Sequence, residues 1–288
     1  MRPRRSVLYI PGANERAMEK AATLAADALV LDLEDAVAPE VKERARRRVC
    51  DAVAAAAYTG REVAVRVNGI GTEWHDADLR AVAAVGPDAV VVPKVGSADD
   101  VRAVETALAE AGAPGHTAIW AMIETPAAVL RAEEIAGASD ALTVLVMGTN
   151  DLAKELRAEP VPGRAPLLTS LSLCLLAARA TGKSILDGVF NDVRDAEGFE
   201  AECVQARQFG FDGKTLIHPG QLEACNRVFT PSEAEVDHAR RVVAAFEEAT
   251  AGGLGVVTVD GRMVENLHVE QARRVLAVAE AVRTRREG

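Results

Sequence analysis

Short runs of β-branched and other apolar residues recur along the chain, and an Ala-, Glu- and Arg-rich stretch with helical spacing follows nearly every one. This alternation is typical of repeated βα units, which form parallel sheets. Eight such runs predict an α/β fold of the (β/α)8 TIM-barrel class. The runs lie at residues 7–10, 29–33, 63–67, 90–93, 119–123, 144–147, 185–189 and 216–217.

The competing fold is a doubly wound open sheet, in which a Gly-rich phosphate-binding turn follows an early strand. The nearest match to that turn contains Gly69 and Gly71, but Trp74 stands where the third glycine belongs. The sequence therefore favours the closed barrel over the open sheet.

The chain continues well beyond the eighth run, further than a last barrel helix requires. We predict a barrel domain over residues 1–229 and a C-terminal helical extension over residues 230–288. Thr230 and Pro231 are expected to begin a helix that runs to about residue 250, and a Gly-rich break precedes a final amphipathic helix. The apolar stripe of that last helix packs either on its own barrel or on a neighbouring subunit.

Composition excludes several classes of partner. The chain has 33 basic and 43 acidic side chains, a net charge of −10, and only 3% aromatic residues, which oppose binding to nucleic acid. No apolar run approaches the roughly 20 residues that span a membrane, and no targeting segment is visible, so we expect a cytoplasmic protein. The four cysteines are widely spaced and do not predict a zinc site.

Charged and amide side chains stand at the ends of most predicted strands, where (β/α)8 enzymes carry their catalytic groups. They are Asp32, Glu34 and Asp35 after the second run, Arg66 and Asn68 in the third, Lys94, Glu124, Asn150 and Asp151 after the next three, and Asn191 and Asp192 after the seventh. Arg66 and Glu124 are expected to meet in the mouth of the barrel, either as an internal ion pair that orients the loops or as part of a site. Asp151 would leave an excess of carboxylate that Mg²⁺ balances.

Seven motifs in order resemble those of the citrate lyase β-subunit/malyl-CoA lyase family, within the HpcH/HpaI aldolase–citrate lyase superfamily. The motifs are Arg5–Gly12, Asp32–Val37, Arg66–Asn68, Pro93–Lys94, Ile123–Thr125, Gly148–Leu152 and Gly213–Pro219. The resemblance covers essentially the whole chain. It implies a (β/α)8 barrel, usually a trimer or a dimer of trimers, that cleaves or forms a C–C bond next to a CoA thioester with Mg²⁺.

The resemblance also implies roles for particular residues. Glu124 and Asp151 become the ligands of Mg²⁺, for which Mn²⁺ can substitute, and Arg66 faces the thioester oxygen. Asn150, beside Asp151, is expected to contact the substrate. Glu34 and Asp35 are expected to hold metal-bound water or Arg66, and only one of them reaches the site directly because neighbouring residues on a strand point to opposite faces.

The C-terminal motif departs from the family pattern. Where the family usually has Gly-Lys-Met-Ile-Asp-x-Pro, with an aspartate that enters the neighbouring subunit's site, this chain has Gly261–Leu267, with Glu265 in place of the aspartate and no proline. A glutamate keeps the acid–base chemistry, but its extra methylene displaces the carboxylate. The displaced group could activate water toward the thioester, which is the chemistry of a malyl-CoA thioesterase. Alternatively, Glu265 is a solvated residue at a helix start.

The phosphates of CoA require a local concentration of cations in this acidic chain. Arg5 and Lys20 are the candidates, together with Arg4 and Arg16, because they flank the first strand and the first helix. Arg16 and Lys20 equally suit a solvated helix face.

The main prediction from the sequence is a Mg²⁺-dependent CoA-ester lyase that acts on a malyl-CoA-like substrate and gives acetyl-CoA and a 2-oxo acid such as glyoxylate. The first alternative is a (3S)-malyl-CoA thioesterase. A second is a citrate lyase β-type subunit that acts on a carrier-bound acyl group, and a third is a barrel aldolase that acts on hydroxy-keto acids without CoA. In each case we expect a homo-oligomer, a trimer or a hexamer.

Overall fold

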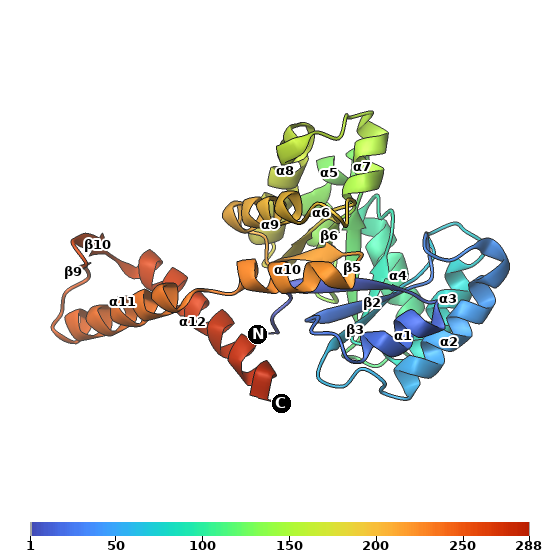
Figure 1. The fold of residues 1–288 in the computed structure, drawn as a ribbon, viewed down its shortest axis with the longest axis horizontal. Coiled ribbons are helices and arrows are strands. Elements are labelled where there is room, and N and C mark those ends of the chain that lie inside the picture. Colours follow the sequence, from blue (N-terminus) through green and yellow to red (C-terminus); the bar gives the residue numbers. More distant parts are fainter. Residues whose placement is uncertain (1, 288) are drawn as a thin grey trace. The chain divides into compact units, whose positions relative to one another are not determined.

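The computed structural model describes residues 2–287, and within them eight parallel strands close into a barrel in the order in which they occur along the chain (Figure 1). The predicted (β/α)8 class is therefore confirmed. The barrel strands are β1 (Ser6–Pro11), β2 (Ala28–Asp32), β3 (Glu62–Arg66), β4 (Ala89–Val92), β5 (Ala118–Ile123), β6 (Leu142–Met147), β7 (Ser184–Asp187) and β8 (Gly213–Leu216). The last two strands end earlier than the apolar runs suggested.

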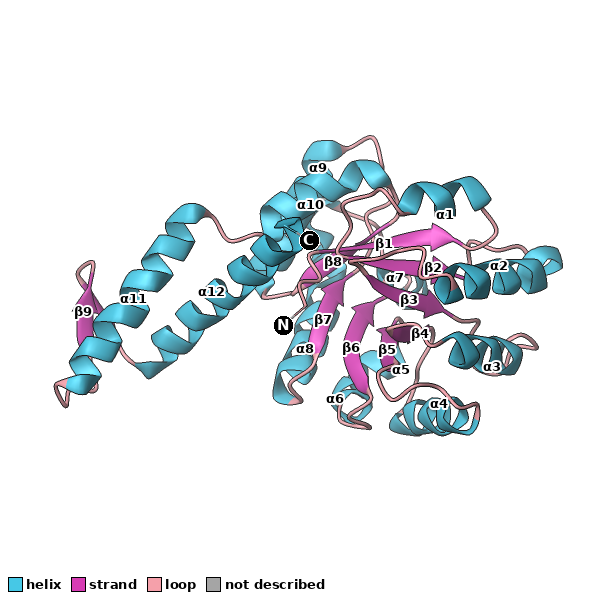
Figure 2. Cartoon of the chain, turned by 90° about the horizontal axis from the view of Figure 1, so that it is seen from below, coloured by secondary structure: helices cyan, strands magenta, loops and turns pink. Residues whose placement is uncertain are grey.

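Helices follow the strands and surround the barrel (Figure 2). They are α1 (Glu15–Ala21), α2 (Lys42–Ala54), α3 (His75–Val85), α4 (Ala98–Glu110), α5 (Pro126–Leu130), α6 (Ala132–Ala136), α7 (Thr149–Leu156), α8 (Leu168–Ala180), α9 (Ala196–Phe209) and α10 (Leu222–Phe229). Short 3-10 helices cover Pro39–Val41, Pro162–Leu167 and Pro219–Gln221. No helix of the described part of the chain is long and apolar enough to cross a membrane.

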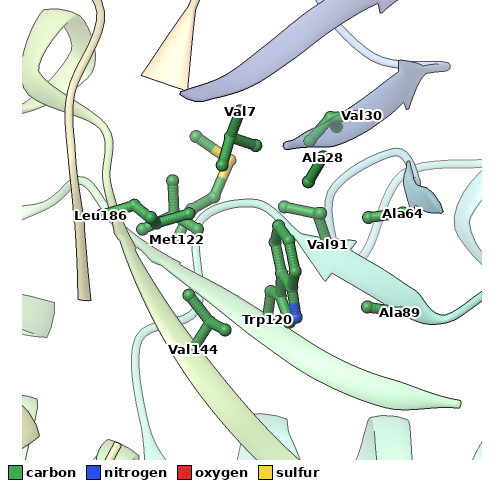
Figure 3. Packing of buried hydrophobic residues seen from close by; sticks show 11 residues of the cluster. Val7, Ala28, Val30, Ala64, Ala89, Val91, Trp120, Met122, Val144 and Leu186 are labelled. Atoms are coloured by element: carbon green, nitrogen blue, oxygen red, sulfur yellow. The ribbon is translucent and has the colours of Figure 1, made fainter. Parts of the chain in front are cut away.

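Side chains of alternate strand residues pack together inside the barrel (Figure 3). Trp120 and Met122 of β5 both point inward, as their spacing of two residues predicts. The other members of this buried cluster are Val7, Ala28, Val30, Ala64, Ala89, Val91, Val144, Val146 and Leu186. The next inward-facing residues along β2 and β3 are Asp32 and Arg66. They lie two residues beyond Val30 and Ala64, at the C-terminal ends of these strands.

The chain divides into two compact units, Arg4–Asn226 and a second unit that contains residues 227–287. The second unit holds α11 (Glu233–Ala251), a hairpin of β9 (Val257–Val259) and β10 (Arg262–Val264), and α12 (Asn266–Glu287). Its own core includes Val242, Val259 and Val269.

Two features of the second unit differ from the sequence prediction. Ser232, not Thr230, caps α11, because its hydroxyl accepts from the backbone N–H of Glu235 while the Glu235 carboxylate accepts from the backbone N–H of Ser232. The β9–β10 hairpin was not predicted. Asp260 and Gly261 form its turn with φ of 49° and 76°, the left-handed values that a tight two-residue hairpin turn requires.

Candidate active site

A cavity of about 380 Å³ opens at the C-terminal ends of the barrel strands. Its lining comes from most strands of the barrel and from the first turn of α7. The lining residues are Tyr9, Pro11, Asp32, Asp35, Ala36, Arg66, Met122, Glu124, Met147, Gly148, Thr149, Asn150, Asp151, Val189, Thr215 and Ile217. Of the strand-end residues singled out in the sequence, Asp32, Asp35, Arg66, Glu124, Asn150 and Asp151 thus share one cavity.

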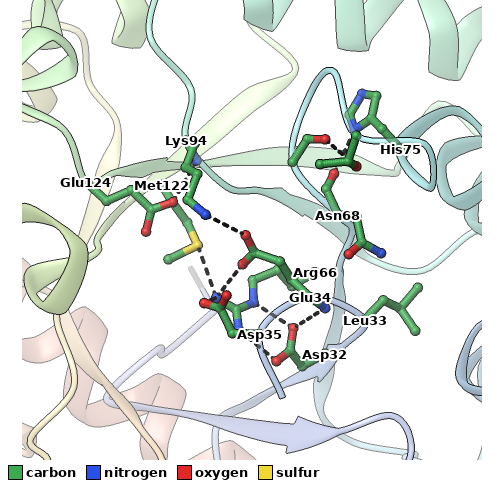
Figure 4. A network of polar contacts seen from close by, with 12 residues as sticks. Asp32, Leu33, Glu34, Asp35, Arg66, Asn68, His75, Lys94, Met122 and Glu124 are labelled. Atoms are coloured by element: carbon green, nitrogen blue, oxygen red, sulfur yellow. Dashed lines mark hydrogen bonds and ion pairs between the residues drawn. The ribbon is translucent and has the colours of Figure 1, made fainter. Parts of the chain in front are cut away.

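Arg66 is held by a neighbouring strand rather than by Glu124 (Figure 4). Its Nε donates to Asp32 Oδ1 and its Nη2 donates to Asp32 Oδ2, both at 2.7 Å, and the two residues are register partners between β2 and β3. Burial lowers the pKa of Arg66, but the Asp32 carboxylate outweighs this effect and the pKa rises. Arg66 is therefore a fixed cation in a two-point clamp. The sequence analysis listed Asp32 among the strand-end residues but assigned it no role in the site.

Glu34 and Asp35 approach Arg66 unequally. Arg66 Nη1 lies 2.9 Å from Glu34 Oε2 and 3.5 Å from Asp35 Oδ2, and the Asp35 side chain is 61% exposed. Glu34 also pairs through Oε1 with Lys94 Nζ at 3.3 Å. Burial raises the pKa of Glu34, although Arg66 and Lys94 oppose that rise. Glu34 thus links two cations. It lies two residues beyond Asp32, the last residue of β2, and like Asp32 it contacts Arg66.

Glu124 follows β5 and its side chain is almost completely buried. Its Oε1 accepts a hydrogen bond from the backbone N–H of Lys94 at 2.7 Å, and Lys94 adopts a left-handed φ of 53°. Burial and the nearby Glu34 carboxylate raise the pKa of Glu124 to about 7. A Cβ atom at Gly148 would collide with the Glu124 side chain, so this position requires glycine.

Asn150 and Asp151 lie in the first turn of α7, where the positive end of the helix dipole favours the Asp151 carboxylate. The Asn150 amide exchanges two hydrogen bonds with Asn191, at 2.8 and 3.1 Å. Asn150 also lines a second cavity of about 440 Å³ that shares Thr149 and Val189 with the first. The sequence signal for this arrangement is the turn Gly148–Asp151 directly after β6.

Tyr9 contributes an aromatic wall that sequence reasoning did not select. The Arg66 guanidinium carbon lies 4.8 Å from the centre of the Tyr9 ring, and the Tyr9 hydroxyl lies 3.8 Å from the sulfur of Met122. Burial raises the pKa of Tyr9 further above its ordinary value, and the nearby carboxylates reinforce this rise. The phenol therefore remains protonated.

Negative charge exceeds positive charge at the site. Five carboxylates (Asp32, Glu34, Asp35, Glu124 and Asp151) surround two cations, Arg66 and Lys94, within the cavity and its immediate wall. Among the described residues, no group of three or more His, Cys, Asp or Glu side chains is arranged to hold a metal ion. Mg²⁺ uses one or two protein carboxylates and completes its shell with water and substrate oxygens, so Glu124 and Asp151 of this cavity are the side chains that could hold it.

Two residues expected at the site, Arg5 and Lys20, lie elsewhere in the barrel unit. Arg5 directly precedes β1, at the N-terminal end of the barrel, and its Nε and Nη2 donate to Asp27 at 2.8 Å, so its charge belongs to a buried ion pair rather than to a phosphate site. Lys20 is exposed in the last turn of α1 and does not line the cavity. Glu265 belongs to the second unit, immediately before α12.

A (β/α)8 barrel with a clamped arginine and surplus carboxylates at its C-terminal mouth defines an enzyme scaffold of the TIM-barrel class. Within that class, the chain belongs to the HpcH/HpaI aldolase/citrate lyase family, whose sequence profile matches residues 5–219. A second profile, for C–C bond lyases of the TIM-barrel fold, matches residues 166–282.

Similar proteins extend this assignment over nearly the full chain. A (3S)-malyl-CoA thioesterase of Cereibacter sphaeroides is 54% identical over 97% of this chain and 96% of its own length. Citrate lyase subunit beta of Escherichia coli is 41% identical over 99% of this chain and 96% of its own length. The crystal structure of the CitE protein of Mycobacterium tuberculosis with magnesium, acetoacetate and coenzyme A is 31% identical, with a TM-score of 0.78 over 96% of this chain and 98% of that one.

These relatives correct the main functional prediction. C–C bond cleavage was placed first, but four relatives at 53–54% identity over 97% of the chain are named thioesterases. Relatives named thioesterase and relatives named citrate lyase subunit beta both match nearly the whole chain, so the motifs that indicated the family do not tell which bond breaks. The lyase prediction was wrong, and the thioesterase alternative fits better.

Proposed function

We propose that the chain is a thioesterase that hydrolyses a malyl-CoA-like thioester to the free hydroxy acid and CoA, with a divalent cation. The observation that carries this proposal is the 54% identity, over 97% of the chain, to a (3S)-malyl-CoA thioesterase. The surplus of carboxylates at the barrel mouth supports the cation, and crystal structures of relatives that contain magnesium support its identity.

Glu124 and Asp151 would hold Mg²⁺, or Mn²⁺ in its place. When bound, the cation supplies Lewis-acid chemistry and fixes the oxygens of a hydroxy acid. The backbone N–H of Lys94 orients the Glu124 carboxylate, and the absence of a side chain at Gly148 leaves room for it. Asn150, beside Asp151, is proposed to contact the acyl group.

Arg66 is proposed to stabilise the negative charge that develops on the thioester oxygen. Its clamp on Asp32 fixes the guanidinium, so its charge is already oriented when negative charge develops on the thioester oxygen. Glu34 holds the other side of the guanidinium and connects it to Lys94. Asp35, the more exposed carboxylate, is proposed to hold water at the rim.

Glu265 is proposed to accept the proton of the attacking water. The support comes from the sequence, because Glu265 stands where the family has an aspartate and could provide a carboxylate for that proton. We expect Glu265→Gln to reduce kcat for thioester hydrolysis by about a hundredfold. A Glu265→Gln enzyme with the wild-type kcat would remove Glu265 from the mechanism.

A citrate lyase β-type subunit is the second candidate function, supported by the 41% identity to that subunit of E. coli. Turnover of a free CoA ester by the isolated chain would count against it. The predicted trimer or hexamer and the predicted cytoplasmic location remain proposals, and light scattering coupled to size-exclusion chromatography tests the first.

Cation removal tests the metal part of the proposal. We expect EDTA to abolish release of free thiol from (3S)-malyl-CoA, and Mg²⁺ in excess to restore it, because the cation contributes several kcal/mol to the transition state. The thiol assay requires a blank for the four cysteines of the chain. Full activity after exhaustive chelation would contradict the assignment of a metal to Glu124 and Asp151.

A further inference from the structure

Tyr9 lies in the candidate site, and its hydroxyl has only a weak hydrogen-bond acceptor beside it. The residue lies on β1, its neighbours Val7 and Pro11 share the inward face, and it lines the same cavity as Glu124 and Asp151. Its ring is fixed against the Arg66 guanidinium at 4.8 Å. The partner of its hydroxyl is the Met122 thioether at 3.8 Å, and a thioether is a weak acceptor.

The other polar donors at the mouth are more firmly engaged. Arg66 donates two hydrogen bonds of 2.7 Å to Asp32 through Nε and Nη2, and its Nη1 lies 2.9 Å from Glu34. Lys94 Nζ pairs with Glu34, and the Asn150 amide pairs with Asn191. Each of these groups already has a carboxylate or amide partner, which holds its side chain in place. At Tyr9 a substrate oxygen displaces only a sulfur contact, which costs little free energy.

We propose that the Tyr9 hydroxyl donates a hydrogen bond to the carbonyl oxygen of the bound thioester and stabilises the oxyanion that forms there. The inference rests on the proposed thioesterase function and adds a catalytic residue to it. It assigns to the phenol the part that backbone N–H groups play in an oxyanion hole.

In the proposed reaction, water is added to the thioester carbonyl and the C–S bond is then broken. Water oxygen bonds to the carbonyl carbon, the π pair moves onto the carbonyl oxygen, and a base takes one proton from the water. The pair then returns, the C–S bond breaks with its electrons on sulfur, and the thiolate takes the proton. Tyr9 keeps its own proton throughout, and the charge of Arg66 behind the ring strengthens the bond to the oxyanion.

The chain offers a clean test because it contains only two tyrosines, Tyr9 and Tyr58. Tyr9→Phe removes the hydroxyl and retains the ring that packs on Arg66. Tyr58→Phe is the matched control, because the Tyr58 hydroxyl donates to the carbonyl oxygen of Met18, which lies on α1 and does not line the cavity. We expect Tyr9→Phe to lower kcat for release of thiol from (3S)-malyl-CoA about a hundredfold, with KM within about threefold of wild type. Tyr58→Phe should retain the wild-type kcat.

A binding experiment separates this inference from the proposed reaction. The probe is a malyl-CoA analogue in which CH₂ replaces the thioester sulfur, so that it keeps the carbonyl oxygen and cannot be hydrolysed. In protein labelled with ¹³C at tyrosine Cζ, saturating analogue with Mg²⁺ should shift the Tyr9 resonance and leave that of Tyr58 in place. The Tyr58→Phe protein assigns the two signals.

The outcomes are distinct. A Tyr9 shift in an enzyme that releases no thiol would retain the Tyr9 contact and overturn hydrolysis. Thiol release with an unchanged Tyr9 resonance and a Tyr9→Phe kcat within twofold of wild type would overturn the role of Tyr9 and retain hydrolysis. An unmoved Tyr9 resonance in the presence of saturating analogue contradicts the contact whatever the activity.

Discussion

Glu124→Gln is expected to lower kcat for thioester hydrolysis by about a thousandfold or more and to weaken Mg²⁺ binding below detection by calorimetry. The change keeps the size of the side chain and the acceptor for the Lys94 backbone N–H, but it removes the negative charge that a hard cation requires. A loss of several kcal/mol of transition-state stabilisation corresponds to that factor, because each 1.4 kcal/mol is about tenfold.

The matched control for Glu124→Gln is Glu105→Gln, the same change on the exposed face of α4. The control should retain wild-type turnover and Mg²⁺ affinity. Circular dichroism should show both variants folded. A Glu124→Gln enzyme that binds Mg²⁺ as tightly as wild type would show that the cation lies elsewhere.

Lys214→Met is expected to destabilise the barrel by about 3–5 kcal/mol, because it removes one of the two cations that neutralise the buried Asp187 carboxylate and its neighbour Glu202. Lys214 of β8 is fully buried and pairs with Asp187 of β7 at 2.7 Å and with Glu202 of α9 at 2.6 Å. Arg164 also pairs with Asp187, at 2.7 Å. Burial lowers the pKa of Lys214, but the two carboxylates outweigh it and raise the pKa, so the lysine is charged in the fold.

Differential scanning calorimetry measures the effect of Lys214→Met, with Lys154→Met on the exposed side of α7 as the control. The barrel transition should fall by on the order of 10 °C in the first variant and by less than about 1 °C in the second. Equal transition temperatures for Lys214→Met and wild type would contradict the account of a closed internal ion network.

The barrel could be predicted from the sequence because its strands are local features. Runs such as Val90–Val92 are apolar, β-branched and bounded by polar residues, and eight of them in alternation with helices fit few other folds. The β9–β10 hairpin was missed although Asp260–Gly261 between alternating apolar residues is a standard hairpin signal. The Gly-rich stretch before it was interpreted only as a break.

The site could be predicted less completely, because pairing across strands depends on register. Position along the strands was enough to place Arg66, Glu124 and Asp151 around one cavity. It did not reveal that Asp32 stands opposite Arg66 in the β2–β3 register and takes its guanidinium. For Arg5 the position along the chain was misleading. The sequence analysis predicted that it binds a phosphate of CoA, but in the fold it forms an ion pair with Asp27.

Motifs shared by a family contain residues that stabilise the fold as well as residues that line the candidate active site. Gly213 and Lys214, part of one motif, serve the barrel: a Cβ at Gly213 would collide with the carbonyl oxygen of Arg4, and Lys214 neutralises buried carboxylates. Such motifs identify the scaffold but do not distinguish hydrolysis from C–C cleavage. The proposed difference lies in the C-terminal motif, where Glu265 replaces the aspartate of the family pattern.

Analysis of the products of (3S)-malyl-CoA with Mg²⁺ tests the thioesterase assignment most directly. The purified 288-residue chain is incubated with the ester, and malate, free CoA thiol, glyoxylate and acetyl-CoA are quantified in the same samples against a protein-thiol blank. If the chain is a thioesterase, we expect malate and CoA in equal amounts, and we expect Glu124→Gln to form neither. Glyoxylate and acetyl-CoA as the initial products, without malate, would contradict the thioesterase assignment.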